Sequence, residues 1–128
     1  MGYFTAMGYR IDFAVRDDTL RAIVSGTASS DYTASWIAED IAAQAKREAR
    51  KQLLVDVRRL GNRIGSLGMI LIPSGWRRES DYRVAVIDVK ENDPHYVFLE
   101  LAARGKGYEL RYFDNATDAL TWLEERPE

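Results

Sequence analysis

Two short apolar runs near the middle of the chain constrain its fold more than any other feature. Leu53–Val57 and Arg83–Asp88 are each dominated by leucine, valine, isoleucine and alanine. Runs of about five such residues are short for a helix, and they lack the alternation of a strand with one solvent-facing side. They are typical of parallel strands that are covered on both faces. The sequence therefore predicts an α/β fold with these two runs as central strands.

The segment before these runs predicts an antiparallel hairpin. Tyr9–Val15 alternates apolar and polar residues, which is the pattern of a half-buried strand. The polar residues 16–19 are expected to form a turn, and Leu20–Gly26 is expected to form a second strand. Because so short a connection leaves no room for a crossover, the two strands should be antiparallel.

Two helices are predicted on either side of the first apolar run. The longer one starts at Ser29-Ser30-Asp31, which offers N-cap side chains, and reaches about Lys51. One apolar stripe runs along it, formed by Ala34, Ile37, Ile41 and Ala45. A shorter helix is expected in the glycine-punctuated segment after the run, and it must stop before Pro73.

Two more helices and one strand are predicted toward the C-terminal end. A helix opens at Asn92-Asp93-Pro94 and ends at Gly105, because proline suits a first helical turn and glycine suits a helix end. Tyr108–Phe113 alternates as a strand. The last helix starts from an Asn115 cap, with Asp118 at the capping-box position.

In chain order these elements predict a mixed, mostly parallel five-stranded sheet with an N-terminal antiparallel hairpin and about four helices. After the hairpin, every connection between strands is long enough for a right-handed crossover. No repeat, low-complexity tract or linker-like stretch divides the sequence. We therefore expect a single domain over residues 1–128, with an ordered core of about residues 9–125.

Composition narrows the classes of function. The chain has no cysteine, which excludes thiolate metal sites and cysteine nucleophiles, and its one histidine, His95, has no partner motif. No metal, cofactor or catalytic residue is therefore expected. The longest apolar stretch, residues 69–72, is far below the ~20 residues that span a bilayer, so no membrane insertion is expected. A cytoplasmic location is the simplest interpretation.

Three segments carry a resemblance to a known family. They are the hairpin that leads directly into a long helix, Leu53–Val57 with the glycine-rich residues 58–70 behind it, and the strand at 108–113 followed by Ala119-Leu120-Thr121-Trp122-Leu123. In this order they resemble the STAS domains, named for sulphate transporters and anti-sigma-factor antagonists. The ending looks like that of a branch of short, mostly uncharacterised bacterial proteins. The resemblance covers roughly residues 9–123 and implies a STAS-like (SpoIIAA-like) fold with a signalling role.

The resemblance also implies where a regulatory site lies. In anti-sigma-factor antagonists the corresponding strand is followed by an Asp-Ser-Ser-Gly-Leu-Gly-like motif with a phosphorylated serine. Aligning residues 67–70 with the Leu-Gly-x-Ile of that family places Gly65 at the serine and Arg63 at the acidic position. Ser66 lies one position later, so the phosphorylation switch is not carried over residue for residue.

Basic residues gather around the same segment. From Lys46 to Arg78 nine arginines and lysines accompany only two acids, whereas the rest of the chain is net negative. Such asymmetry marks a surface for a small anion or an acidic protein. The candidate site is the loop after the third strand, with Arg58, Arg59, Arg63, Gly65, Ser66, Trp76 and Arg77. A tight glycine turn with solvated arginines is the alternative interpretation.

These features predict a non-enzymatic regulatory or protein-interaction domain that binds an anion or an acidic partner. A small-molecule or lipid carrier is the first alternative, and an enzyme of unknown chemistry is the second. Asp56 and Asp88 end parallel strands and are expected to form hydrogen bonds rather than an acid–base pair. Nucleic acid is not expected, since no aromatic stacking motif accompanies the arginines. A homodimer is expected to form through the edge near the first strand, with Tyr3, Phe4, Met7 and Tyr9, or through the adjoining helix.

Overall fold

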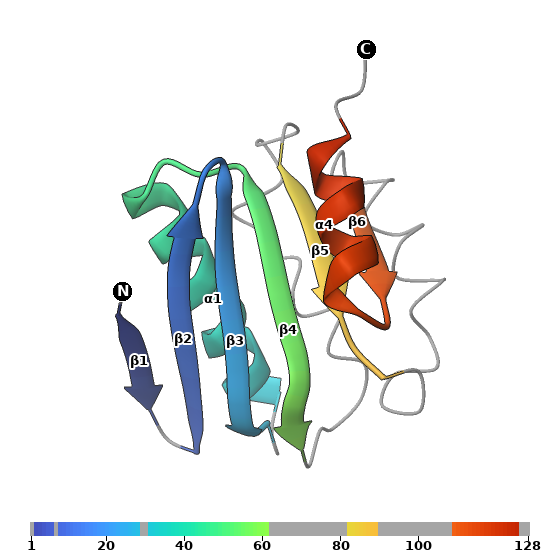
Figure 1. Ribbon diagram of the computed structural model, residues 1–128. Helices are drawn as coiled ribbons and strands as arrows, with labels where there is room; N and C mark the ends of the chain where they lie inside the picture. Colours follow the sequence, from blue (N-terminus) through green and yellow to red (C-terminus); the bar gives the residue numbers. More distant parts are fainter. Residues whose placement is uncertain (1, 7, 29–30, 62–81, 90–108, 126–128) are drawn as a thin grey trace.

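The computed structural model describes residues 2–6, 8–28, 31–61, 82–89 and 109–125 of the chain (Figure 1). These residues form one six-stranded sheet and two helices. The strands lie side by side in chain order: β1 (Tyr3–Ala6), β2 (Tyr9–Arg16), β3 (Thr19–Thr27), β4 (Gln52–Gly61), β5 (Arg83–Ile87) and β6 (Glu109–Phe113). The helices are α1 (Asp31–Arg47) and α4 (Ala116–Glu124).

The strand pairing confirms the mixed, mostly parallel sheet with an antiparallel hairpin. β1, β2 and β3 pair antiparallel, and β3, β4, β5 and β6 pair parallel. β1 adds a sixth strand to the five expected. It has only four residues and no clear alternation, so the sequence pattern does not reveal it. The second and third predicted helices fall on residues 62–81 and 90–108, which lie outside the described residues.

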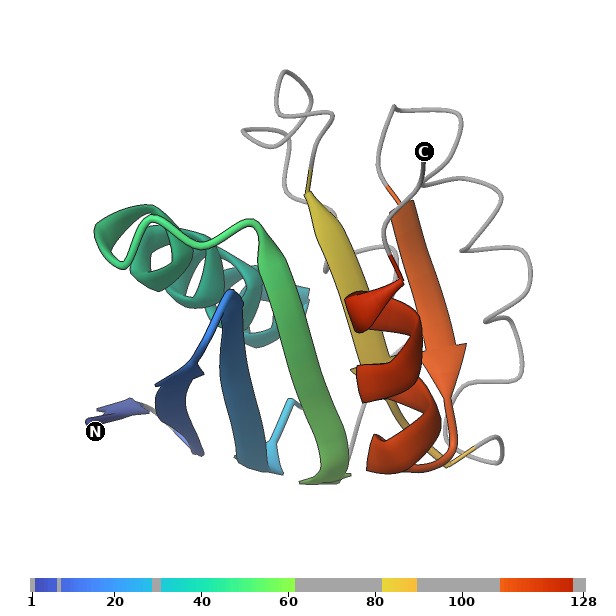
Figure 2. The same ribbon diagram turned by 45° about the horizontal axis from the view of Figure 1, so that its top comes forward.

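α1 and α4 cover opposite faces of the sheet. Figures 1 and 2 show α1 behind β2, β3 and β4, and α4 in front of β5 and β6. The larger core lies on the α1 face, where the predicted stripe of Ile37, Ile41 and Ala45 is buried with Leu53, Val55 and Val57 of β4. Leu54 belongs to the smaller core beside Trp122 and Leu123 of α4. Because β4 contributes to both cores, the prediction of a central strand covered on both faces is confirmed.

A part-buried hydrogen bond connects β2 to α1 beside the larger core. The Tyr9 hydroxyl donates to the Asp40 carboxylate at 2.5 Å, and only 4% of Tyr9 is exposed. Burial, together with the hydrogen bond and negative charge of Asp40, holds the pKa of the Tyr9 hydroxyl well above its usual value. The expectation that Tyr9 forms part of a dimer surface is therefore wrong, because its ring is a core residue.

The end of β3 requires a glycine. Gly26 has a φ of +104°, and a Cβ at this position would lie 2.2 Å from the Gly8 carbonyl oxygen. The neighbouring Thr27 amide donates to that same oxygen at 2.8 Å. The turn between β1 and β2 therefore packs directly against the end of β3, which a larger residue at this position would prevent.

Both described helices have identifiable ends. The Asn115 side chain accepts from the Asp118 amide at 2.8 Å, which confirms the predicted N-cap of α4. α1 ends at Arg47 rather than at Lys51. The reason is a Schellman-type end, in which Ala49 has a φ of 54° and the Arg50 amide donates to the Ala45 carbonyl at 3.0 Å.

Candidate interaction site at the end of β4

Arg58 and Arg59 were expected on the loop that leaves the third strand of the prediction, but they lie within β4. This strand continues to Gly61, because Arg59, Leu60 and Gly61 pair with Ser25, Gly26 and Thr27 of β3. The predicted strand stops at Val57 because the apolar run ends there, although the pairing with β3 continues. The prediction that Arg58 and Arg59 lie on a loop is therefore wrong, and both belong to the C-terminal end of a central strand.

A bulge places both arginines on the solvent side of β4. The register between β3 and β4 shifts between the pairs Ile23–Asp56 and Ser25–Arg59, so that β4 has one extra residue there. Val57 and Leu60 are buried on either side of the two arginines, which are both exposed. Strict alternation would have buried one of the two, and the bulge avoids this.

Arg58 is held by a carboxylate of its own strand. Its Nη2 lies 2.8 Å from Asp56 Oδ2, its Nε donates to Oδ1 at 3.0 Å, and its backbone amide donates to Oδ1 at 3.1 Å. Partial burial raises the pKa of Asp56, but the hydrogen bonds from Arg58 and the positive charges of Arg58 and Arg59 outweigh it and lower that pKa below its usual value. An anion that approaches Arg58 must therefore compete with Asp56.

Arg59 is in a different state. Its side chain is exposed and forms no hydrogen bond or ion pair with another described residue. It adds positive charge beside Asp56 without a direct bond to that carboxylate. The remaining members of the predicted site lie outside the described residues: Arg63, Gly65, Ser66, Trp76 and Arg77. Of the candidate residues that the structure describes, Arg59 is thus the one ready to bind an anion.

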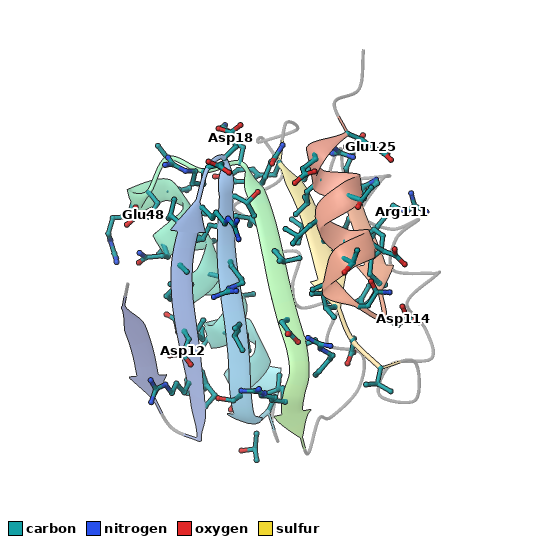
Figure 3. All side chains as sticks on the ribbon, viewed as in Figure 1. Asp12, Asp18, Glu48, Arg111, Asp114 and Glu125 are labelled. Atoms are coloured by element: carbon teal, nitrogen blue, oxygen red, sulfur yellow. The ribbon has the colours of Figure 1, made fainter. Side chains whose placement is uncertain are left out.

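The neighbours of Arg59 come from the N-terminal hairpin. β3 places Ser25 beside Arg59, and β2 in turn places Arg10 beside Ser25. These residues belong to the face of β2, β3 and β4 opposite α1, which we call the open half. Its members are Arg10, Asp12, Ala14, Arg16, Arg21, Ile23, Ser25, Asp56, Arg58 and Arg59. Figure 3 shows the side chains on this half, with Asp12 labelled on β2.

Arginines dominate the open half. Arg10 pairs with Asp12 at 2.9 Å, as Arg58 pairs with Asp56. The side chains of Arg16 and Arg21 are exposed and, like that of Arg59, form no hydrogen bond or ion pair with another described residue. Five arginines and two aspartates leave an excess of positive charge on this surface, although the whole chain has a net charge of −2. Arg10, Arg16 and Arg21 were not among the predicted site residues, because a count of charge along the chain does not group residues by strand face.

The same face of the sheet continues under α4, over β5 and β6, and we call this part the covered half. There the Arg83 guanidinium lies 4.1 Å from the centre of the Trp122 ring, and its Nε is 2.6 Å from a carboxylate oxygen of Glu109. Arg83 also donates to the Leu123 carbonyl at 3.4 Å and to the Glu125 carbonyl, at the C-terminal end of α4. Arg111, labelled in Figure 3, lies 6.0 Å from the Trp122 ring centre.

Asp56 and Asp88 form hydrogen bonds, as predicted, although Asp56 lies within β4 and only Asp88 directly follows the end of its strand. Asp56 accepts from Arg58, and the buried Asp88 accepts from the Val89 amide at 2.8 Å. Within the described ranges, no group of three or more histidine, cysteine, aspartate or glutamate residues has the arrangement to hold a metal ion. Neither helix in the described part of the chain is long and apolar enough to cross a membrane.

Comparison with known proteins places this geometry in a known fold. No family model and no curated protein matches the chain. An anti-sigma factor antagonist from Mycobacterium paratuberculosis is similar in structure, with a TM-score of 0.64, 18% identity, and coverage of 91% of this chain and 95% of that one. An uncharacterised protein of the DUF3478 family from Shewanella loihica, which has a SpoIIAA-like fold, matches with a TM-score of 0.51, 19% identity and coverage of 94% and 97%. The chain therefore has the SpoIIAA-like fold that its resemblance to STAS domains implies.

Proposed function

We propose that the chain is a non-enzymatic regulatory domain of STAS type, which acts in the cytoplasm by binding an acidic protein partner or a small anion. The binding site is the end of β4 with the segment that follows it. The observation that carries the proposal is the exposed, uncommitted guanidinium of Arg59 beside the bulge of β4. A guanidinium group is well suited to carboxylates and phosphates because it donates two parallel hydrogen bonds.

The described residues support a binding role rather than a catalytic one. One similar structure is an anti-sigma factor antagonist, and a likeness of fold alone leaves the activity open. Among the described residues, the one buried carboxylate, Asp88, accepts from a neighbouring backbone amide. The described residues thus offer binding groups but no paired acid and base.

A ligand panel tests the proposal. The chain is titrated with phosphate esters, nucleotides, acidic peptides and fatty acids, and its thermal unfolding is followed by fluorescence. A bound ligand stabilises the folded chain by about 2.7 kcal/mol at a hundredfold excess over its dissociation constant. We expect acidic peptides or phosphate esters to raise the melting temperature. Stabilisation by fatty acids alone would contradict the proposal and favour the carrier alternative.

Two variants locate the binding site. Joint Arg59→Ala and Arg63→Ala substitution should abolish the stabilisation, because both guanidinium groups are lost from the proposed site. Arg47→Ala is the matched control: Arg47 is exposed in the last turn of α1 and donates to Gln44 at 2.6 Å. If both variants lose the ligand equally, binding depends on overall charge and the proposed site is wrong.

We also propose that the chain forms a homodimer through β1. β1 is the outermost strand on its side of the sheet, and an outer strand offers backbone groups to a second copy. Tyr9 takes no part, since it is buried. Sedimentation at tens of micromolar chain, a working range for weak dimers, should show a dimer. Monomer alone at that concentration would exclude this pairing.

A further inference from the structure

The open half has the composition of a protein-binding surface. Its floor is half-buried and partly apolar, with Ala14 and Ile23 in neighbouring strands. Around this floor stand Arg16 and Arg21 at one end and Arg59 at the other. An apolar centre with arginines around it is typical of protein interfaces, in which arginine is enriched.

The covered half shows what kind of segment such a face accepts. α4 lies on it, contacts β4, β5 and β6, and brings Trp122 over Arg83. The backbone carbonyls at the C-terminal end of α4 accept hydrogen bonds from the same guanidinium. One helix thus supplies an apolar contact and the electron-rich groups that the arginine needs. The open half also carries arginines, but none of the described helices covers them.

The dimensions of the open half suit one helix. The distance from β2 to β4 spans two inter-strand gaps, about 10 Å in total, which is close to the diameter of a helix. Along β3, the four steps from Arg21 to Ser25, the neighbour of Arg59, cover about 13 Å. This length corresponds to about nine helical residues. A single helix of a few turns can therefore reach both groups of arginines.

We propose that the open half binds an acidic amphipathic helix of a partner protein. Its apolar residues pack on Ala14 and Ile23, and its carboxylates pair with Arg16, Arg21 and Arg59. This goes beyond the proposed function because Arg16 and Arg21 lie on β2 and β3 rather than in the segment after β4. Docking changes no bond and requires no cofactor.

The surface favours a protein partner over a membrane. Asp12 and Asp56 stand in the middle of the open half, where they would face lipid phosphates. The large apolar residues that are exposed in the described part of the chain are Trp36, Val89 and Leu120, and none of them lies on this half. Without such a side chain to insert, the surface could bind lipid only through its charge. An acidic amphipathic helix can place its carboxylates beside the arginines at the two ends and its apolar residues over Ile23, which lies between the two aspartates.

The test uses a synthetic peptide of about 18 residues, or five helical turns, with glutamates on one face and leucines with one tryptophan on the other. Titration into the isotope-labelled chain, followed by amide NMR, should shift the signals of Arg16, Arg21, Ile23, Ser25 and Arg59. A scrambled peptide of the same composition should bind at least about tenfold more weakly, since it cannot present both faces at once. Equal binding of the two peptides, shifts confined to other strands, or no binding overturns the proposal.

Charge reversal provides the matched control. Joint Arg16→Glu and Arg21→Glu should weaken the peptide by about tenfold or more. Joint Lys46→Glu and Arg47→Glu makes the same change of charge at the end of α1 and should leave the affinity within about twofold. If the two double variants act alike, the open half is not the site. Binding to vesicles of phosphatidylserine and phosphatidylcholine that exceeds binding to the peptide would assign this surface to a membrane instead.

Adding the Arg63→Ala variant to the peptide titration separates this inference from the proposed function. If Arg63→Ala lowers ligand binding while the Arg16 and Arg21 reversal does not, the segment after β4 is the site and the open half is not. If only the Arg16 and Arg21 reversal lowers binding, the open half binds the peptide independently of the segment after β4.

Discussion

The covered half and the open half of one sheet face both carry arginines, but the surroundings of these arginines differ. On the covered half, Arg83 stacks on Trp122 and pairs with Glu109, and it is half-buried under α4. On the open half, Arg16 and Arg21 stand exposed, and no described side chain pairs with them. The two halves differ because a helix follows the last strand of the covered half. α4 comes directly after β6 and covers the strands nearest to it.

Arginines on this face therefore contribute to stability only where another element, such as α4, packs over them. A guanidinium group in water gains little from a single exposed ion pair. Under an aromatic ring and away from water, the same group gains more from stacking and from charge-assisted hydrogen bonds. Arg83 therefore stabilises the fold, whereas Arg16 and Arg21 remain available to bind.

The largest effect is expected from removing the cover. Trp122→Ala deletes a ring that is 9% exposed and contacts Arg83 and Phe113. We expect the free energy of unfolding to fall by about 3–5 kcal/mol. Chemical denaturation measures this change. Trp122→Phe is the control, because it keeps an aromatic ring over Arg83, and it should cost much less. A loss below about 1 kcal/mol for the alanine variant would mean that α4 does not hold the covered half closed.

A second pair of variants compares the stability that one residue contributes on each side of the boundary between the two halves. Leu54 of β4 is 3% exposed and packs under α4, whereas Ile23 lies on the neighbouring strand in the open half and is half-buried. Leu54→Ala should cost about 2–4 kcal/mol, and Ile23→Ala about 1 kcal/mol. Both values come from urea unfolding curves. Equal costs would show that the open half is covered in solution as tightly as the covered half.

The pH dependence of stability reports on the ion pair of the open half. The pKa of Asp56 is lowered in the folded chain, so its stabilising contribution is present above its unfolded pKa of about 3.9. The contribution is lost as the pH falls through the folded pKa. Asp56→Asn should therefore reduce stability by about 0.5–1 kcal/mol at pH 7, a difference that shrinks below about pH 4.

Asp12→Asn is the control for this measurement. The Arg10–Asp12 pair is more exposed than the Arg58–Asp56 pair, with side-chain exposures of 50% and 44% against 42% and 14%. Its loss should therefore matter less. A difference between Asp56→Asn and the unchanged chain that stays constant from pH 7 to pH 3 would show that the charge of Asp56 is not what stabilises this strand.

The sequence predicted the fold better than the site, and the reason is the range of the interactions. Leu53–Val57 could be assigned from its own composition, because burial on both faces demands apolar residues at consecutive positions. The Asn115 cap could also be assigned locally, since the cap bonds a residue three positions away. These features need no knowledge of distant parts of the chain.

The surroundings of Arg59 could not be predicted in this way. Ser25 and Arg10 reach it only through the pairing of β2, β3 and β4 and through a bulge that changes the alternation of β4. The signal in the sequence was present but indirect. Arg10, Asp12 and Arg16 occupy the polar phase of a strand that alternates, so they had to share one face. Assigning charges to strand faces before counting them would have found the open half.

The smallest effect on stability is expected from the residues that we propose to be the most important for binding. Arg21→Ala and Arg16→Ala should each change the free energy of unfolding by less than about 0.5 kcal/mol, because neither side chain is buried or paired with a described residue. Arg83→Ala is the counterpart on the covered half and should cost about 1–2 kcal/mol, since it removes a stacked and hydrogen-bonded group. Thermal and urea unfolding of the three variants measure these differences. Replacing either exposed arginine also removes one of the like charges that repel one another on the open half, which keeps the cost small. A cost for Arg21→Ala as large as that for Arg83→Ala would show that Arg21 is held by the fold, and a side chain that the fold already holds is a poor candidate for binding a partner.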